Sequence, residues 1–361
     1  MNTYRLDLYD TSGDLQAVIT DYRRLSYVRR VNAPGLVEFE LAGNHAILED
    51  LATNWQIEVW RKPSGGAWAR EITGLYRYLR WTYDNDNNAI LRCPGLMSML
   101  GWRIVAWTAA YTDRSKFTSE KAETIGNTLV KYNATSDATT GNGRERDGAI
   151  TGLTVEADGA EGNTIDWYCA YDNLLTSLQD LAKVGGGDFD LVKTSSTAWQ
   201  YRWYTGQLGT DNSSNVTFAL ERGNMANPQY IDNRLNEKTV CIVGGQGEEA
   251  NRTIEVRTGT NYNASTNNVE MFEQATDITT QAGLQSRGDK ALAEVEALKE
   301  FSFDVLQIPG CEYGDDYDLG DKVTAVNPYH QTTYTVKVQS VSVLVSADGS
   351  EDINVETSEP L

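Results

Sequence analysis

A glycine-rich loop is the stretch of this sequence that comes closest to a ligand-binding motif. Residues 245–250, GQGEEA, have the G-x-G-x-x-A spacing of a dinucleotide-binding loop and follow a strand-like run at 239–243. Such a loop holds a pyrophosphate only where a helix begins at its glycines. Here residues 251–258 alternate between apolar and polar side chains, as in a strand, and Glu248 and Glu249 would repel phosphate. The sequence therefore predicts a strand, a turn and a strand, and no nucleotide.

The histidines, serines and carboxylates show no pattern that predicts a catalytic centre. His45 and His330 are the only histidines, and no further residue is placed to complete a triad or a metal site with them. Residues 283–288, GLQSRG, approach a nucleophile elbow, but Gly283 is one position too far from Ser286 and the segment has a helical pattern. With 51 acidic residues, carboxylate pairs suited to glycoside hydrolysis arise by chance. We predict no catalytic residue, no cofactor and no enzymatic activity.

Two acidic stretches have the composition of a calcium site. Residues 84–88, DNDNN, resemble the opening of an EF-hand loop, but Ala89 stands where glycine is needed and Gly95 where the bidentate glutamate is needed. Residues 315–321, DDYDLGD, form a denser acidic cluster, which also suits a turn into a strand with Gly320 at a positive φ. The sequence favours a polar turn at both places. We predict no metal site, while spacing alone leaves calcium binding at 315–321 open.

The composition argues against several classes of protein. Acidic residues outnumber basic ones by 51 to 31, a net charge of −20, and nucleic-acid binding relies on basic patches. No run approaches the ~20 apolar residues of a membrane helix, and the first residues, MNTYRLD, show no secretory signal. The four cysteines are too widely spaced for a zinc motif or a disulfide scaffold, so we expect buried thiols at Cys93, Cys169, Cys241 and Cys311.

Most of the chain has the period-two pattern of β-strands. Val37–Leu41, Gln56–Trp60 and Tyr76–Tyr83 alternate cleanly, and residues 84–88 connect the last of these to Ala89–Cys93 as a hairpin. Residues 133–163 are rich in Thr, Asn, Asp and Gly. They predict a long surface excursion with one strand at 150–155.

Three segments have the apolar stripe of a helix that packs on a sheet. The first is Ser119–Tyr132. The second follows Asp172, a candidate N-cap, and ends at glycines 185–187. The third is Thr280–Lys299.

The order of strands repeats faintly between the two ends of the chain. A strand at 55–60, a loop, a long hairpin over 72–83 and a return at 89–93 match 322–326, 334–345 and 353–356 in order and length. We expect a mainly β protein with an α+β insertion. The predicted domains are a β-barrel-like domain at 1–111, a peripheral α+β domain with a long polar loop at 112–217, and a second β-barrel-like domain with one long helix at 218–361.

Several segments resemble, in order, those of siphophage tail proteins of the baseplate-hub type. They are RERDGAITGLTV (144–155), DNLLTSLQDLAKVGGGDFD (172–190), YTGQLGTDNSSNVTFALERGNMANPQY (204–230), the run from NRLN (233–236) through the glycine-rich loop to Arg252, and YDLGDKVTAV (317–326). The segments cover most of the chain. Residues 133–143 contain no motif of this family.

The resemblance implies a structural role in the virion of a bacteriophage. In that family, paired barrel domains form a ring in a homotrimer at the tail tip, adapting the tube to the tip. The ring surrounds the channel for DNA and the tape-measure protein. Expected partners are the distal tail or tube protein, the tape measure, and tip or fibre proteins. No specific nucleic-acid binding and no membrane segment are expected, and assembly is expected in the host cytoplasm. An acidic chain suits such a ring, because a negative wall repels DNA.

Two alternatives belong to other functional classes. A tail-associated enzyme would degrade cell wall or glycan, but the chain ends soon after its last hairpin, which leaves no expected room for a lytic domain. A host-glycan-binding protein would use some of the nine Trp and 19 Tyr as sugar platforms. Most of these lie in alternating runs such as WQYRWY (199–204), where packing is the commoner role.

Overall fold

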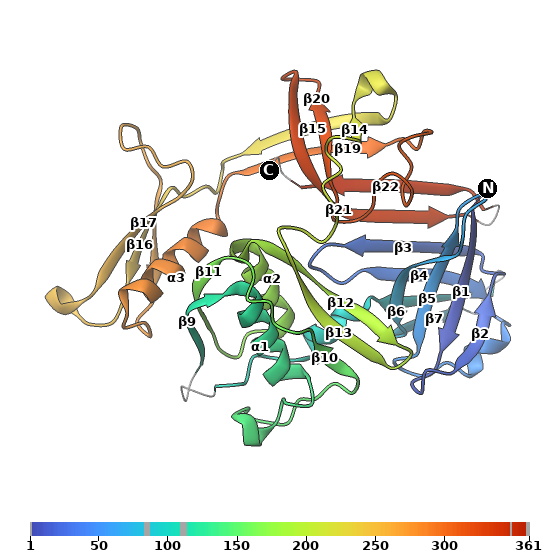
Figure 1. The fold of residues 1–361 in the computed structure, drawn as a ribbon, viewed down its shortest axis with the longest axis horizontal. Helices are drawn as coiled ribbons and strands as arrows, with labels where there is room; N and C mark the ends of the chain where they lie inside the picture. The colour runs from blue at the N-terminus through green and yellow to red at the C-terminus, as the bar shows by residue number, and fades with distance from the viewer. Residues whose placement is uncertain (1, 83–86, 109–113, 347–348, 359–361) are drawn as a thin grey trace.

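The computed structural model describes residues 2–82, 87–108, 114–346 and 349–358. Strands from both ends of the chain lie together, and an α+β part and a smaller sheet with one helix lie on one side of them (Figure 1). The expectation of a mainly β fold with an α+β insertion is confirmed. In the described part of the chain, no helix is both long and apolar enough to cross a membrane.

The N-terminal strands form two sheets over one core. They are β1 (Thr3–Tyr9), β2 (Leu15–Ile19), β3 (Arg24–Arg30), β4 (Leu36–Ala42), β5 (Gln56–Lys62), β6 (Ala69–Leu75), β7 (Tyr78–Thr82) and β8 (Asn88–Pro94). One sheet has the order β2-β1-β5-β6, and the other contains β3-β4-β8-β7. Strict alternation places Val37, Phe39 and Leu41 of β4 in the core, as the period-two pattern predicts.

The C-terminal strands continue the larger sheet. They are β14 (Thr217–Phe218), β15 (Met225–Asn233), β19 (Leu298–Val305), β20 (Lys322–Asn327), β21 (Thr332–Val345) and β22 (Glu351–Thr357). β21 pairs with β20 along its first half and with both β22 and β3 along its second half. The sheet therefore runs β14-β20-β21-β3-β4-β8-β7, with β22 on β21, and the two ends of the chain share one core.

The strand order that repeats at the two ends differs in one respect. The run 72–83 is not one long strand: the chain leaves β6 at Leu75 and begins β7 at Tyr78 in the other sheet. Gly74 lies against Cys93, where a Cβ atom would come within 2.6 Å of the carbonyl oxygen, so glycine allows the crossing. The counterpart β21 stays continuous. β7 and β8 pair as the predicted hairpin, whose connection at 83–86 lies outside the described residues.

The α+β part has its own core. It contains β9 (Ser115–Lys121), α1 (Ala122–Ala134), β10 (Leu153–Val155), β11 (Thr164–Cys169), α2 (Leu174–Gly185), β12 (Gly187–Ser195) and β13 (Ala198–Thr205). Its strands form two sheets, β10-β13-β12 and β11-β9, and helices α1 and α2 bury their apolar stripes in the core that they share. The cap of α2 is Asn173 and not Asp172, because the Asn173 side chain accepts bonds from the amides of Leu175 and Thr176. Gly186, at φ +70°, ends the helix as predicted.

A third unit is inserted between β15 and β19. Its sheet has the order β17-β16-β18, from β16 (Val240–Gly244), β17 (Ile254–Thr258) and β18 (Glu270–Gln274), and α3 (Gln281–Ala293) covers one face. α3 ends at Ala293, six residues before the predicted end at Lys299. Residues 298–305 form β19 instead, because Phe301, Phe303 and Val305 alternate into the main core.

The polar segment 133–163 is bonded to the body at Asn133, at Gly148 and Ala149, and at Gly159. The Asn133 side chain accepts bonds from the amides of Ala106 and Trp107, and Trp107 stacks on Tyr132 with ring centroids 4.7 Å apart. Its single strand is β10, within the predicted 150–155. Short 3₁₀ turns complete the fold: η1 (Ala46–Glu49), η2 (Leu96–Trp102), η3 (Thr140–Asn142), η4 (Leu220–Arg222) and η5 (Glu249–Asn251).

Candidate functional site

The glycine-rich loop joins two antiparallel strands. β16 pairs with β17 from Val240–Thr258 to Gly244–Ile254, and the amide of Gly245 donates to the carbonyl of Thr253. The only helical turn after the glycines is η5, three residues long, and the chain then enters β17. The predicted order of strand, turn and strand is therefore confirmed. No α-helix begins at this loop, and the three-residue turn η5 is too short to form a phosphate site.

The other residues considered for chemistry lie apart from one another and have structural contacts. The Nδ1 atom of His45 accepts from the amide of Ile47 at the start of η1. His330 lies in the β20–β21 turn, edge-on to the ring of Tyr230. Ser286 lies within α3, as its helical pattern predicts. The four cysteines are buried, as expected, and none forms a disulfide.

The acidic residues 315–321 form a turn whose carboxylates receive bonds from the protein. Asp321 accepts bonds from the amide of Thr210, the side chain of Asn212 and the amide of Asp318. Asp318 pairs with Arg29. Gly320 has a φ of +86°, as predicted for this turn. Across the described residues, no group of three or more His, Cys, Asp or Glu side chains is arranged to hold a metal ion.

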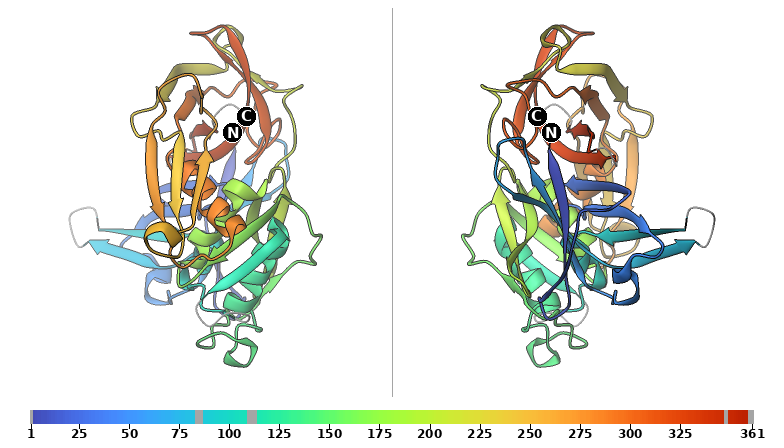
Figure 2. Two further views of the ribbon diagram at one scale, coloured as in Figure 1. Left: turned by 90° about the vertical axis from the view of Figure 1, so that its left-hand side faces the viewer. Right: turned by 90° about the vertical axis from the view of Figure 1, so that its right-hand side faces the viewer.

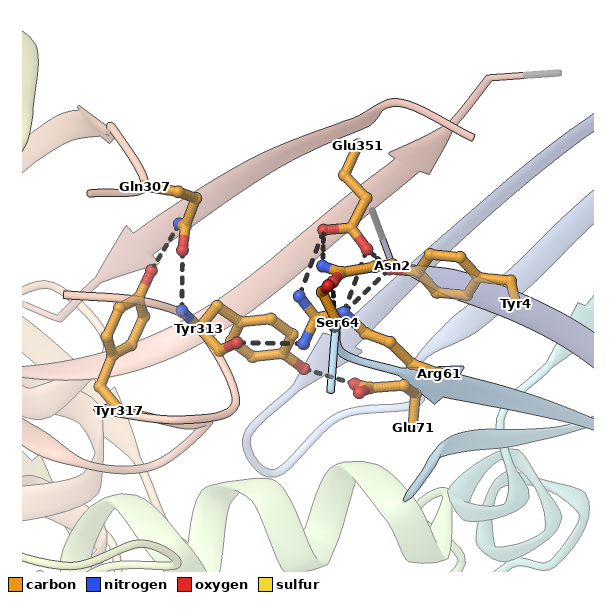
Figure 3. A network of polar contacts seen from close by, with 9 residues as sticks. All are labelled: Asn2, Tyr4, Arg61, Ser64, Glu71, Gln307, Tyr313, Tyr317 and Glu351. Carbon is orange, nitrogen blue, oxygen red and sulfur yellow. Dashed lines mark hydrogen bonds and ion pairs between the residues drawn. The ribbon is translucent and has the colours of Figure 1, made fainter. Parts of the chain in front are cut away.

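A buried polar network lies where the two ends of the chain meet (Figure 3). At its centre is Arg61 of β5, whose Nη2 atom lies 3.2 Å from Oε2 of Glu351 on β22. The Nε atom of Arg61 donates to the hydroxyl of Tyr4 and to Oε1 of Glu351, and its Nη1 atom donates to the carbonyl of Tyr313. The Tyr4 hydroxyl and the Asn2 side chain also donate to Glu351. We call this network the terminal seam.

The seam continues through the loop between β19 and β20. The Tyr313 hydroxyl donates to Glu71 at 2.7 Å and accepts from Arg29 at 2.6 Å. Gln307 accepts from the amide of Tyr313 and donates to the hydroxyl of Tyr317. The loop 307–317 is therefore bonded to strands β3, β5 and β6 of the N-terminal region.

The seam keeps its charges in the buried state. Burial acts to raise the pKa of Glu351, but hydrogen bonds from Arg61 and Tyr4 lower it below its usual value. Burial acts to lower the pKa of Arg61, and its bonds to Glu351 and Tyr4 raise it instead. Burial, followed by the charge of Glu351, raises the pKa of Tyr4, which keeps its hydroxyl protonated as a donor. The directions of these shifts favour a charged Arg61 beside a charged Glu351 at the centre of the seam.

Two further ion pairs connect the α+β part to the strands at either end of the chain. Asp188 of β12 lies 2.9 Å from Nζ of Lys337 on β21 and accepts from the side chain of Asn32. Glu58 of β5 pairs with Lys193 of β12 at 2.8 Å and with Arg70 of β6 at 3.1 Å. Glu58, Asp188 and Glu351 each face a cation from another segment of the chain.

A cavity of about 210 Å³ lies where these parts meet. Its wall includes Arg29, Arg70, Glu71, Asp190 and Lys193. Burial raises the pKa of Asp190, although the amide of Leu191 and the charge of Arg29 act against it. Of the cations on this wall, Arg29 pairs with Glu71 and Asp318, and Arg70 and Lys193 pair with Glu58. The charged groups around this cavity connect segments of the chain, and the residues named here include no nucleophile beside a general base.

The inserted unit contacts the α+β part through a more exposed set of side chains. Lys290 of α3 lies 3.2 Å from Asp180 and 5.6 Å from the ring centre of Trp167. Asp277 pairs with Arg114, and Thr280 lies 3.4 Å from the Tyr168 hydroxyl. A cleft of about 470 Å³ with many charged side chains lies beside this contact, lined by residues of β11 and α3. We call this set the α3 contact.

The residues of the seam could not be found by local spacing. Arg61 and Glu351 are separated by 290 positions, and each lies in its own strand beside another charged residue, Lys62 or Asp352. One sequence signal was available: each is a charged residue within a strand, Arg61 between Trp60 and Lys62 and Glu351 before the apolar Ile353 and Val355. That pattern is common to exposed strand residues, so it does not mark a buried pair.

Comparison with solved structures shows that the fold is that of phage tail proteins. Over 99% of this chain and 98% of the other, it matches the 43 kDa tail protein of prophage MuSo2 from Shewanella oneidensis, with a TM-score of 0.61 and 12% identity. The prophage tail protein gp18 from Listeria monocytogenes EGD-e matches over 98% and 94%, with a TM-score of 0.58 and 10% identity. A tail protein from Neisseria meningitidis MC58 matches over 99% and 97%, with a TM-score of 0.57 and 11% identity.

Sequence comparison identifies the family. Comparison with curated protein sequences gives no significant match. Residues 5–357, which include both ends of the seam's central ion pair, match the family described as siphovirus ReqiPepy6 Gp37-like protein. The chain therefore belongs to the siphovirus ReqiPepy6 Gp37-like family of tail proteins, and the resemblance to siphophage tail proteins seen in its sequence is confirmed.

Proposed function

We propose that this tail protein is the hub at the tip of the phage tail. Three copies form a ring that adapts the tail tube to the tip and surrounds the channel for DNA and the tape-measure protein. The observation that carries the proposal is the fold, which is shared with three phage tail proteins over nearly the full length of each chain. The structural role in the tail follows from the family, and the ring and its position at the tip are the proposed part.

The joined ends of the chain support a ring-forming role. The N-terminal and C-terminal strands share a sheet and a core, and the terminal seam bonds the loop 307–317 to both. A subunit joined in this way can serve as a rigid wall of the ring, because buried, hydrogen-bonded polar groups connect the two ends of its chain. We propose the division 1–111, 112–217 and 218–361 as three parts of this wall, with the α+β part at the periphery.

The charge of the chain suits a channel that DNA must pass. A net charge of −20 repels DNA phosphates, which limits adhesion during passage. We propose that the strands lining the channel present aspartate and glutamate to it. The proposed partners are the tube protein, the tape measure and the tip or fibre proteins, with assembly in the host cytoplasm.

Labelling of intact tails tests the proposal. A short epitope tag on an exposed loop such as 261–268, bound by gold-conjugated antibody, is expected to place label at the tip in electron micrographs. Label along the tube, or tails without label, would contradict the proposed position. A reconstruction of the tip is expected to show three copies around the axis.

A hydrolysis assay tests the proposed absence of catalysis. The purified chain is expected to release no more material from bacterial cell wall than buffer alone. Release that a single Asp or Glu substitution abolishes would show that the chain is a tail-associated enzyme.

A further inference from the structure

A cavity of about 260 Å³ lies beside the α3 contact, where the inserted unit meets the α+β part. In Figure 1 and in the left view of Figure 2, α3 lies next to the α+β part. The wall of the cavity combines side chains of β11, α2 and α3. Junctions between separately packed units are common places for ligand sites. We call this space the α3 cavity.

The indole of Trp167, on the wall of the α3 cavity, has a hydrogen-bond donor without an acceptor. Trp167 is 6% exposed, and its Nε1 atom is buried with no hydrogen-bond partner among the described residues. Burial raises the pKa of the neighbouring Cys169 thiol to about 12, and a protonated thiol is a weak acceptor for this N–H group. A buried donor that has lost its bond to water is costly, and a bound molecule with an acceptor would remove that cost.

The ammonium group of Lys290, also on the wall, shares its carboxylate with a second lysine. Its Nζ atom lies 3.2 Å from Oδ2 of Asp180, whose Oδ1 atom lies 3.0 Å from Nζ of Lys183. One carboxylate therefore faces two cations, which leaves one positive charge in this group of three residues uncompensated. Arg287, the other cation on the wall, is paired with Glu273. The surplus charge at Lys290 favours an anion in the cavity.

The two carboxylates on the wall are already bonded to other parts of the chain. Both oxygens of Asp289 accept bonds from Arg257, and Asp166 accepts a bond from the amide of Ser119. The wall also includes three apolar side chains, those of Ile165, Val184 and Ile278. The cavity therefore offers donors and apolar surface, and a ligand must supply the acceptors.

We propose that the α3 cavity binds a carboxylate attached to an apolar group. The carboxylate oxygens accept bonds from the Trp167 indole and the Lys290 ammonium, and the apolar group contacts the apolar side chains of the wall. The last residue of a peptide chain and a free carboxylic acid both have this chemistry. A ligand bound here contacts β11 and α3 at once, so it connects the α+β part to the inserted unit. The inference goes beyond the proposed function and does not depend on the ring.

Water is the alternative occupant of the cavity. A water molecule would also accept a bond from the Trp167 indole. It is neutral, however, and does not compensate the charge of Lys290, and the apolar side chains of the wall offer it no hydrogen bonds. A carboxylate meets all three conditions, and a cavity that holds only water is an outcome that the experiment must be able to detect.

Titration of the full chain, labelled with heavy nitrogen, tests the proposal by NMR. The indole N–H of Trp167 is observed directly, and its resonance is identified by its absence from Trp167→Phe. N-acetyl-leucine is expected to shift this resonance saturably, with a dissociation constant on the order of 1 mM for a ligand of this size. N-acetyl-leucinamide has the same apolar group without the charge and should bind at least about tenfold more weakly. Equal binding of acid and amide overturns the proposal, and no saturable shift overturns it in favour of water.

Substitution of Lys290 separates the charge of the cavity from a general effect on the fold. Lys290→Gln should weaken binding of N-acetyl-leucine about tenfold and leave binding of the amide unchanged. Lys131→Gln is the matched control, because Lys131 also lies on a helix, pairs with an aspartate and contacts an aromatic ring, but does not line the cavity. It should change binding of the acid by less than about twofold. Equal effects of the two variants would contradict a site at Lys290.

Substitution of Trp167 tests the indole donor in the same way. Trp167→Phe removes the N–H group, and binding of N-acetyl-leucine, followed by saturation transfer to its methyl groups, should weaken about tenfold. Trp203→Phe is the control, because Trp203 is also 6% exposed with a buried Nε1 atom that has no partner among the described residues, but it does not line the cavity. Binding that both variants weaken alike would rule out a bond from Trp167. Melting temperatures check that the variants are folded.

Two further comparisons identify the source of the ligand and separate this inference from the proposed function. A tripeptide with a free carboxylate that binds at least about tenfold more tightly than N-acetyl-leucine indicates the end of a protein chain, and equal binding indicates a free carboxylic acid. Either result supports the site. Tails labelled at the tip, with no binding to the isolated chain, would remove this site and leave the proposed function standing. Binding without label at the tip would be a failure of the proposed function alone.

Discussion

The terminal seam and the α3 contact join parts of the same chain by different means. In the seam, the side chains of Arg61 and Glu351 are 6% and 12% exposed, and every charged group has partners from several segments. In the α3 contact, Arg114 and Asp277 are 18% and 42% exposed, and a cleft lies beside them. Buried pairs lose much when one partner is removed, whereas exposed pairs contribute little and are screened by salt. We therefore expect the two ends of the chain to keep a fixed relative position at the seam. We expect the inserted unit to move more readily relative to the α+β part at the α3 contact.

The largest expected effect is the loss of Arg61. Arg61→Ala leaves the carboxylate of Glu351 buried without its cation, so we expect the free energy of unfolding to fall by about 3–5 kcal/mol. Lys183→Ala, which removes an exposed partner of Asp180, is the control and should change it by less than about 0.5 kcal/mol. Urea denaturation measures both. Similar losses in the two variants would remove the distinction between buried and exposed ion pairs in this chain.

The next effect is a dependence on pH that belongs to the seam. The pKa of Glu351 is lowered in the folded chain, so the unfolded chain binds its proton first as the pH falls through the usual value near 4.5. The stability that the ionised Glu351 contributes is therefore present above that pH and lost below it. Glu351→Gln should be less stable than wild type at pH 7, and the difference should shrink toward pH 3. A difference in melting temperature that is independent of pH would contradict this.

A smaller effect is expected at the α3 contact. Asp277→Asn removes the charge that faces Arg114, and for a pair this exposed we expect a loss of about 0–1 kcal/mol. Hydrogen exchange in α3 and β11 should become faster in the variant, and high salt should make wild type resemble it. Exchange in β5 and β22 should not respond to either change. Faster exchange at the seam in high salt would show that the two joints are not distinct.

The smallest effect is expected at Asp190, beside the cavity. Burial raises the pKa of this carboxyl, so burying its ionised form costs the folded chain some stability. Asp190→Asn removes that cost while keeping the size of the side chain, and should leave the melting temperature unchanged or slightly higher at pH 7. Because a raised pKa favours folding as the pH falls, any gain should disappear at acidic pH. A clear loss of stability at pH 7 would show that the charge of Asp190 is needed by Arg29.

Local patterns in the sequence determined the type of most elements. Alternation in Val37–Leu41 predicted β4, and the strand-like residues after the glycine-rich loop predicted β17 and excluded a phosphate-binding helix there. The glycines at 185–187 placed the end of α2. These features depend on neighbours within a few residues, so they can be seen in the chain itself. The local pattern did not determine where α3 ends. The helix stops at Ala293, because tertiary packing places Phe301 and Phe303 of the following strand, β19, in the main core.

Only the tertiary structure decided which distant residues meet. The pairing of β3 with β21, the ion pair between Arg61 and Glu351, and the crossing of β6 to β7 at Gly74 all join segments that local patterns treat separately. From its local pattern, a charged residue in an alternating strand is expected to be exposed to solvent. It becomes part of a buried ion pair only when another strand places an opposite charge beside it. The sequence by itself determined a mainly β chain of phage-tail type. The joining of its N-terminal and C-terminal strands into one sheet and core depends on contacts between residues some 290 positions apart.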